Sequence, residues 1–495
     1  MNLEWAAGEE QSVVHGGQAS RFEKIQSDPG CKHKHMDPHQ RLSDKSSQEI
    51  VPSEGDVNRS PFREEWLQNH TGAETRHWLE EDAKYFLHQS LSTPCLNVLQ
   101  HCEGIYLEDL EGRRYMDFHG NNVHQAGFAH PRVIQAIKDQ LDKLSFCTRR
   151  YTNIPAIQLA KKLAELAPGD LNKVLFAPGG TSAIGMALKL ARAATGRFKT
   201  ISMWDSFHGA SLDAISIGGE ALFRQGIGPL LPGTEHVPPP DPAHCPWGCA
   251  GTCNLKCAEY IEYVLEKEGD TAAVIAETVR STPYIPPPDY WRVVREACDR
   301  HGALLILDEI PHCLGRTGKM FTFEHYGIIP DMVVIGKGLG GAVFPLAALI
   351  VRESLDCVPE RALGHYTHEK NPVACAAALA LIEVLESENL LENARRLGDY
   401  ALERMHAMKV RHPLIGDVRG LGLLMGIELL KDRATRERAT PEAEQVMYAA
   451  LAKGLSFKVT MGNILTLTPP LTITQPQLDT AFDILEDCLR EIEQT

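Results

Sequence analysis

The fold of this chain is decided by residues 304–348, which read LLILDEIPHCLGRTGKMFTFEHYGIIPDMVVIGKGLGGAVFPLAA. Two apolar runs in and beside this stretch, 303–307 and 332–335, are short and rich in branched side chains, which is typical of strands buried in a parallel sheet. Polar residues and glycines follow each run directly. Because open α/β folds bind their ligands at the carboxyl edge of such a sheet, we expect functional groups at the ends of both strands.

The residues at these two strand ends suit one kind of cofactor chemistry. The first run is followed by Asp308 and Glu309, and the second by Lys337. A lysine that is partly desolvated has a lowered pKa and becomes a better nucleophile. A lysine that forms a Schiff base, with an aspartate on a pyridinium nitrogen, is the binding pattern of pyridoxal 5′-phosphate (PLP). The spacing alone is equally compatible with a surface position for Lys337 and with Asp308 as a helix N-cap.

The amino-acid sequence of this stretch resembles the corresponding sequence in the class III aminotransferases, which are PLP enzymes of fold type I. The resemblance runs from about Gly104 to the C-terminus. It implies that Asp308 binds the pyridine nitrogen and that Lys337 forms the internal aldimine. It also implies an α/β fold with a large, mainly parallel PLP domain and a smaller α+β C-terminal domain, which includes a strand at 419–428, and a homodimer with shared active sites.

The composition is that of a globular enzyme. With 495 residues, 43% of them hydrophobic, the chain is long enough for two or more domains. Its net charge of −15 argues against nucleic-acid and anionic-membrane partners, and no apolar run is long enough to span a bilayer. The N-terminus has no apolar signal segment, and the thirteen cysteines are mostly scattered, so we expect reduced thiols and a cytoplasmic location.

Composition and the family resemblance together divide the chain into four expected parts. Residues 1–72 are polar and lack periodicity, so we expect a mostly disordered extension. Residues 73–118 are expected to form an N-terminal segment with a helix and a hairpin that turns at 110–112. The large PLP domain is expected at 119–372. Connecting helices and the small domain are expected at 373–495.

A glycine-rich segment is predicted to bind the cofactor's phosphate. The short strand at 174–177 leads into Pro-Gly-Gly-Thr-Ser, which opens a helix. N–H groups and hydroxyls at a helix start bind oxyanions, although such a segment alone is a weak signal. The resemblance assigns this role to Gly180 and Thr181.

The resemblance also assigns the other cofactor contacts. Phe207 corresponds to the aromatic residue that stacks on the PLP ring, which is favourable by about 1 kcal/mol, and His208 follows it. Glu277 ends a buried strand in the position of the family's Glu-Pro pair. Thr367 corresponds to the threonine that reaches the PLP phosphate of the other subunit.

Four positions depart from the family pattern: Ser182, Ala210, Thr278 and Pro311. Ala210 replaces an arginine that in many relatives holds the carboxylate of a γ- or δ-amino acid. Pro311 replaces a glutamine that contacts the PLP 3-hydroxyl. These departures favour a substrate other than an ordinary ω-amino acid.

Four polar residues are candidate substrate contacts: Asn121, Arg149, Arg150 and Arg280. Asn121 lies with His124 in a polar segment at the expected rim of the site. Arg149 and Arg150 are adjacent, so on an extended segment at most one faces the site. Guanidinium groups bind carboxylate, phosphate and phosphonate in a fork. The alternative for each residue is a solvated side chain or a turn cap.

Four cysteines recur at every fourth residue of the loop 232–257: Cys245, Cys249, Cys253 and Cys257. Four thiolates bind zinc or an iron–sulfur cluster in other proteins, but the usual CxxC pairs are absent here. We therefore expect free thiols, with a metal site and a disulfide as the open alternatives.

The predicted PLP site is compatible with transamination, elimination and racemisation, because all three start with loss of the same proton. Transamination of a primary amine or amino acid is the family's usual activity and the leading prediction. The alternative is an ammonia-lyase that eliminates from a hydroxylated aminoalkyl phosphonate or phosphate without a keto-acid acceptor. The segments GGTSAIGMAL (179–188), WDSFHG (204–209) and THEKNP (367–372) resemble that branch of the family. A non-catalytic PLP-binding protein is disfavoured because Asp308, Lys337 and Thr367 are retained.

Overall fold

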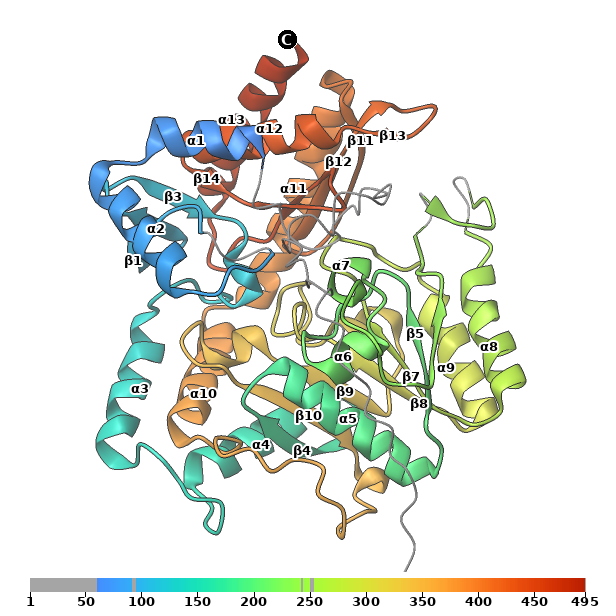
Figure 1. Cartoon of the computed structure of the whole chain (residues 1–495). Helices are drawn as coiled ribbons and strands as arrows, with labels where there is room; N and C mark the ends of the chain where they lie inside the picture. The colour runs from blue at the N-terminus through green and yellow to red at the C-terminus, as the bar shows by residue number, and fades with distance from the viewer. Residues whose placement is uncertain (1–59, 91–94, 242–243, 250–252, 495) are drawn as a thin grey trace, which may run out of the picture. The chain divides into compact units, whose positions relative to one another are not determined.

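The computed structural model describes residues 60–90, 95–241, 244–249 and 253–494, all of which lie in one compact unit. Its centre is a seven-stranded sheet with the order β4-β10-β9-β8-β7-β5-β6 (Figure 1). The strands are β4 (Leu171–Ala177), β5 (Lys199–Met203), β6 (Thr234–Val237), β7 (Thr271–Glu277), β8 (Leu304–Asp308), β9 (Met332–Ile335) and β10 (Ala347–Arg352). Six of them run in the same direction, and only β10 is reversed, antiparallel to both of its neighbours, β4 and β9.

The parallel register brings the predicted functional groups to one edge of the sheet. Glu277, the last residue of β7, lies directly opposite Asp308, the last residue of β8. Asp308 in turn lies opposite Val334 in β9, three residues before Lys337. The prediction of a mainly parallel sheet is therefore confirmed, and the predicted site residues lie at neighbouring strand ends.

Helices cover both faces of this sheet, which explains why its strands are apolar throughout. In β8, Ile306 packs in a cluster with helix α5 (Gly180–Thr195). Its neighbours Leu305 and Leu307 pack in a second cluster with α9 (Tyr290–His301) and α10 (Pro372–Ser387). This alternation is the two-residue period of a strand between two layers of helices.

A second group of elements joins the two ends of the described chain. β1 (Leu99–Glu103), β2 (Tyr106–Asp109) and β3 (Arg114–Asp117) form the predicted hairpin with one additional strand, and β14 (Leu455–Ser456) pairs parallel with β3. The N-terminal segment is therefore continuous with the C-terminal part of the chain (Figure 1).

The remaining sheet belongs to the C-terminal part. It contains β11 (Ile415–Leu421), β12 (Leu424–Asp432), β13 (Glu437–Arg438), β15 (Lys458–Thr460) and β16 (Ile464–Leu467). The single strand expected at 419–428 is a hairpin of β11 and β12 instead. The apolar run continues through the turn at Gly422, where φ is +55°, so hydrophobicity alone did not mark the break.

The extension predicted for residues 1–72 lies mostly outside the described residues, but its last part is helical. Helix α1 (Pro61–His70) begins at Ser60, whose side chain accepts a hydrogen bond from the Arg63 N–H, and Pro61 occupies the first turn. Trp66 is buried at 3% exposure. Structure therefore begins before residue 72, because a serine–proline helix start precedes it.

The other helices complete the layers: α2 (Ala73–Tyr85), α3 (Pro131–Lys143), α4 (Ile154–Leu166), α6 (Leu212–Ile217), α7 (Ala221–Arg224), α8 (Lys256–Glu268), α11 (Leu390–Arg411), α12 (Thr440–Ala452) and α13 (Gln475–Glu493). Short 3₁₀ helices lie at η2 (Gly120–Asn122), η4 (Thr322–Tyr326), η5 (Lys337–Gly340) and η6 (Glu353–Leu355). Among the described helices, none combines the length and the apolar character needed to cross a bilayer.

Candidate active site

Asp308 is held in a fixed orientation at the end of β8. Its side chain is buried at 2% exposure, and His208 Nδ1 lies 2.8 Å from its Oδ2. The Ile310 N–H donates to its other oxygen at 3.1 Å. A buried carboxylate with two donors is well placed to present charge to a third group. The structure therefore brings together the predicted residues Asp308 and His208, with His208 as a partner of the aspartate.

Glu277, Arg280 and Phe207 meet beside this pair. Glu277 Oε2 lies 3.3 Å from Arg280 Nε and 3.5 Å from the Phe207 N–H. Glu277 and Arg280 are 5% and 4% exposed. Because the two opposite charges are buried together, the guanidinium of Arg280 already has a protein carboxylate as a partner.

The predicted phosphate-binding segment approaches its neighbours too closely for side chains. A Cβ on Gly209, where φ is +127°, would lie 2.2 Å from Thr181 Oγ1. A Cβ on Gly180, the first residue of α5, would lie 2.6 Å from Ile310 Cδ1. The first backbone N–H groups of α5 have no partner within the helix and lie next to the Thr181 hydroxyl, as in other oxyanion sites at helix starts.

Lys337 lines the same cavity as the glycine-rich start of α5. It is half-buried in the turn after β9, and it lines a cavity of about 360 Å³ with Gly179, Gly180 and Val123. Residues 342–346 complete the lining. The structure thus brings the predicted lysine to the predicted phosphate cradle.

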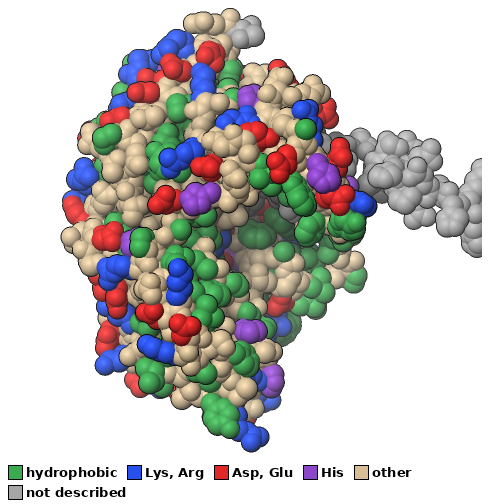
Figure 2. Space-filling model, turned by 90° about the vertical axis from the view of Figure 1, so that its left-hand side faces the viewer, with side chains coloured by type: hydrophobic (Ala, Val, Ile, Leu, Met, Phe, Trp, Pro, Cys, Tyr) green, Lys and Arg blue, Asp and Glu red, His purple; other side chains and the backbone are tan. Residues whose placement is uncertain are grey.

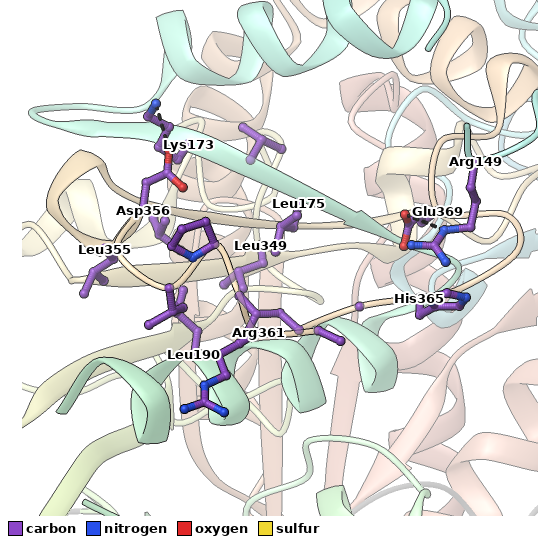
Figure 3. A pocket seen from close by; sticks show the side chains of 17 residues that line it. Arg149, Lys173, Leu175, Leu190, Leu349, Leu355, Asp356, Arg361, His365 and Glu369 are labelled. Carbon is purple, nitrogen blue, oxygen red and sulfur yellow. Dashed lines mark hydrogen bonds and ion pairs between the residues drawn. The ribbon is translucent and has the colours of Figure 1, made fainter. Parts of the chain in front are cut away.

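Three predicted residues lie elsewhere in the described chain. Arg149 pairs with Glu369 at 3.3 Å in a second cavity of about 390 Å³, whose lining does not include Lys337 (Figure 3). The floor of that cavity is apolar and is formed by side chains such as Leu190 and Leu349. Arg150 and Thr367 are exposed. None of these three residues belongs to the lining of the Lys337 cavity.

The residues of the polar rim predicted around Asn121 differ in how far they are buried. Asn121 is exposed and adopts a left-handed backbone with φ +45°. His124 is fully buried, and its Nε2 lies 3.2 Å from the Asp117 carbonyl oxygen. Burial lowers the pKa of His124 to about 3, so its imidazole is neutral. Val123, between them, is the residue of this rim that lines the Lys337 cavity.

The geometry is matched by the comparisons with known proteins. Residues 88–489 match the family model described as "Aminotransferase class-III". The chain belongs to this family.

Relatives within the family differ in reaction. An (R)-1-hydroxy-2-aminoethylphosphonate ammonia-lyase from Vibrio splendidus is 49% identical over 89% of this chain and 95% of its own length. A leucine/methionine racemase from Thermococcus litoralis is 39% identical over 78% of this chain and 89% of its own. An amine transaminase from an uncultivated Pseudomonas species, solved with PLP bound, has a TM-score of 0.77 and 30% identity, and covers 82% of this chain and 99% of its own.

Class III aminotransferases are PLP-dependent enzymes of fold type I, and this chain shares their cofactor and fold. Its residues fit PLP: the start of α5 offers backbone N–H groups and the Thr181 hydroxyl to an anion, and a buried carboxylate is held at the end of β8. The lysine after β9 reaches the same cavity as the helix start. An anion site, a partner for the ring nitrogen and an amine are the three groups that the cofactor requires.

Two residues of the site were missed by the sequence reasoning. Ile310 touches the positions of both Gly180 and Gly336, and it is 9% exposed. Its place directly after the acidic pair was the available signal. Gln125 packs against Gly338, next to Lys337, and no periodicity or motif marked it.

Glu309 has a structural role that explains one departure from the family pattern. Its carboxylate is fully buried and accepts hydrogen bonds from Thr278 Oγ1, the Thr322 N–H and the Phe323 N–H, each at 2.7 Å. Burial raises the pKa of Glu309 to about 7. Thr278, which replaces the family's usual residue, therefore ties the end of β7 to the end of β8 through Glu309, while the two N–H groups tie Glu309 to η4.

The four cysteines of the 232–257 loop are free thiols, and Cys249 and Cys257 are buried. Cys249 Sγ donates to Asn254 Oδ1 at 3.1 Å. In the described part of this loop and elsewhere among the described residues, no group of three or more potential ligands is arranged to hold a metal ion.

Proposed function

We propose that this protein is a PLP-dependent ammonia-lyase that acts on a hydroxylated aminoalkylphosphonate without a keto-acid acceptor. The observation that carries the proposal is the 49% identity, over nearly the full length of both chains, to the Vibrio splendidus ammonia-lyase. The other relatives described above reach 39% and 30%. Two of the positions that depart from the family pattern agree with this proposal. Ala210 offers no cation to a substrate carboxylate, and the Thr278 hydroxyl donates a hydrogen bond to Glu309.

Lys337 and Asp308 are proposed as the catalytic residues. PLP, when bound, withdraws electrons from the carbon that carries the amine and so makes its C–H bond breakable. Asp308, oriented by His208 and the Ile310 N–H, holds a proton on the ring nitrogen. The Lys337 amine accepts the proton from the C–H bond and passes it to the hydroxyl that leaves the neighbouring carbon.

The overall reaction balances without a second substrate. The substrate loses its hydroxyl as water when the neighbouring C–H bond breaks, and one water is consumed when ammonia is released. The net products are ammonia and a phosphonoaldehyde. Because the substrate's amino group leaves as ammonia and none stays behind in the site, turnover needs no keto-acid acceptor.

Arg280 is proposed as the contact for the phosphonate. Among the four predicted substrate residues, it is the one that lies beside Glu277 and Phe207 at the cofactor end of the sheet. A phosphonate dianion would compete with Glu277 for the guanidinium fork. Asn121, Arg149 and Arg150 stay predicted substrate contacts.

A homodimer is also proposed, with Thr367 contributing to the partner's cofactor site. Large apolar side chains are exposed at the end of α3 and around the start of α4: Leu141, Leu144, Phe146, Tyr151, Ile154 and Ile157. Figure 2 shows hydrophobic side chains around a hollow on the side of the unit that carries α3. Such a concentration on one face supports an interface. The cytoplasmic location stays a prediction.

The deciding experiment measures ammonia release from the purified holoenzyme without any keto acid. The amines offered are aminoethylphosphonate with and without a neighbouring hydroxyl, β-alanine and 4-aminobutyrate. Multiple turnovers on the hydroxylated phosphonate alone would support the lyase. A single equivalent of pyridoxamine phosphate, followed by arrest until pyruvate or 2-oxoglutarate is added, would instead establish transamination, the family's usual activity.

A further inference from the structure

Lys337 has a backbone conformation that residues with side chains rarely adopt. Its φ is +47°, in the left-handed region, and it is the first residue of η5. Glycine adopts this region without steric cost, whereas other residues stay there only when their surroundings hold them. The turn after β9 must therefore be held by specific contacts.

One such contact is made by Gln125, from the loop that follows η2. Gln125 is fully buried, and its side-chain amide lies against Gly338, the residue after Lys337. A Cβ added to Gly338 would lie 1.8 Å from Gln125 Oε1 and 2.1 Å from Cδ. The amide therefore occupies the space beside Gly338 where a side chain would begin, so the backbone of the turn is packed tightly against Gln125 on this side.

Gln125 is itself fixed in place. Its Nε2 donates to the Asn122 carbonyl at 3.3 Å, and its main-chain carbonyl accepts from the Leu471 N–H at 2.8 Å. In the described part of the chain, its Oε1 is buried without a hydrogen-bond donor. Burial of an unpaired carbonyl oxygen is unfavourable, so hydrogen bonding does not explain where this oxygen lies. The packing of the amide against Gly338 accounts for the position of this oxygen.

We propose that Gln125 is a positioning residue that holds the Lys337 turn in its left-handed conformation and so directs the lysine amine before PLP arrives. The proposal rests on the proposed function in one respect, the assignment of Lys337 as the cofactor lysine. A turn that is held in advance does not have to be reorganised when the covalent link forms. When the amide is removed, the backbone of the Lys337 turn can relax to a more common conformation. PLP binding must then restore the strained conformation, and this lowers the affinity for PLP.

The test titrates PLP into the apoenzyme of Gln125→Ala and follows the absorbance of the lysine-bound cofactor against pH. We expect the PLP dissociation constant to rise roughly five-fold or more, and the midpoint of the absorbance titration to move. Gln125→Met keeps the bulk of the side chain without the amide and is expected to restore both values, because the contact is steric. Gln140→Ala is the matched control, since Gln140 is also buried but bonds Leu144 at the end of α3.

The outcomes separate this proposal from the assignment of Lys337. Wild-type affinity and titration in Gln125→Ala would overturn the role of Gln125. If that variant does not fold, Gln125→Asn, which withdraws the amide by one methylene, is measured in its place with the same expected weakening. Lys337→Ala is expected to lose the borohydride-reducible link to PLP. A link that persisted at another lysine would overturn both the assignment and the positioning role.

Discussion

His208 Nδ1 lies 2.8 Å from Asp308 Oδ2, and both side chains are buried. The two residues are a hundred positions apart in the chain and meet because β5 and β8 end at the same edge of the sheet. The imidazole N–H therefore orients the carboxylate that is proposed to hold the ring-nitrogen proton. Loss of this hydrogen bond leaves a buried charge with one donor fewer.

We therefore expect His208→Ala to lower kcat/KM roughly 10- to 100-fold, because a hydrogen bond to a buried charge contributes about 1.5–3 kcal/mol. Steady-state ammonia release measures the loss. His101→Ala, at an exposed position of β1, is the control and is expected to retain wild-type activity. Equal activity of His208→Ala and the control would remove His208 from the mechanism.

Thr367 is expected to act across the dimer. Lys337→Ala and Thr367→Ala homodimers should each bind or use PLP poorly. A mixture of the two, dissociated and reassembled, should regain activity, because each heterodimer contains one site with both wild-type residues. Absence of any recovery in heterodimers purified by two different tags would place Thr367 in its own protomer's site or outside the mechanism.

His124 should make the folded protein sensitive to acid. Burial, and to a lesser extent the charge of Arg316, lowers the pKa of His124 from 6.5 to about 3. Between these values the unfolded chain binds a proton that the folded protein does not. The free energy of unfolding therefore falls as the pH drops below 6.5, by about 1.4 kcal/mol per pH unit from this residue.

The measurement compares urea unfolding of wild type and His124→Asn at pH 7 and pH 5, at one protein concentration. Asparagine retains a donor toward the Asp117 carbonyl oxygen, 3.2 Å from the wild-type imidazole, and does not titrate. We expect the variant to lose less stability than wild type on acidification. Identical losses would show that His124 does not contribute.

Thr278→Val should destabilise the protein by about 1–3 kcal/mol, because it removes the 2.7 Å hydrogen bond to the buried Glu309 carboxylate. Thr278→Ser keeps the hydroxyl and is the matched control, with stability expected close to wild type. Urea unfolding measures both. A Thr278→Val protein as stable as the serine variant would mean that the two backbone N–H groups satisfy Glu309 without the threonine.

Much of the fold was predictable because its signals are local. The apolar runs at 303–307 and 332–335 predicted strands that the structure places as β8 and β9. The polar residues that follow these two runs identify Asp308 and Lys337 as candidate site residues from the sequence alone. The serine–proline start of α1 and the turn at Gly422 are equally local, but they lie inside a polar and an apolar run respectively, so composition masked them.

The sequence by itself determined the strands of the central sheet, the glycine-rich helix start and the residue types that PLP requires, because each depends on neighbours within a few positions. Only the tertiary structure decided that His208 orients Asp308, that Arg280 pairs with Glu277, that Arg149 turns to Glu369 and that Gln125 packs on the Lys337 turn. Most of these contacts join residues from separate strands and loops. Apart from the Arg149–Glu369 pair, which lines a separate cavity, they form where the parallel sheet brings its strand ends to one edge.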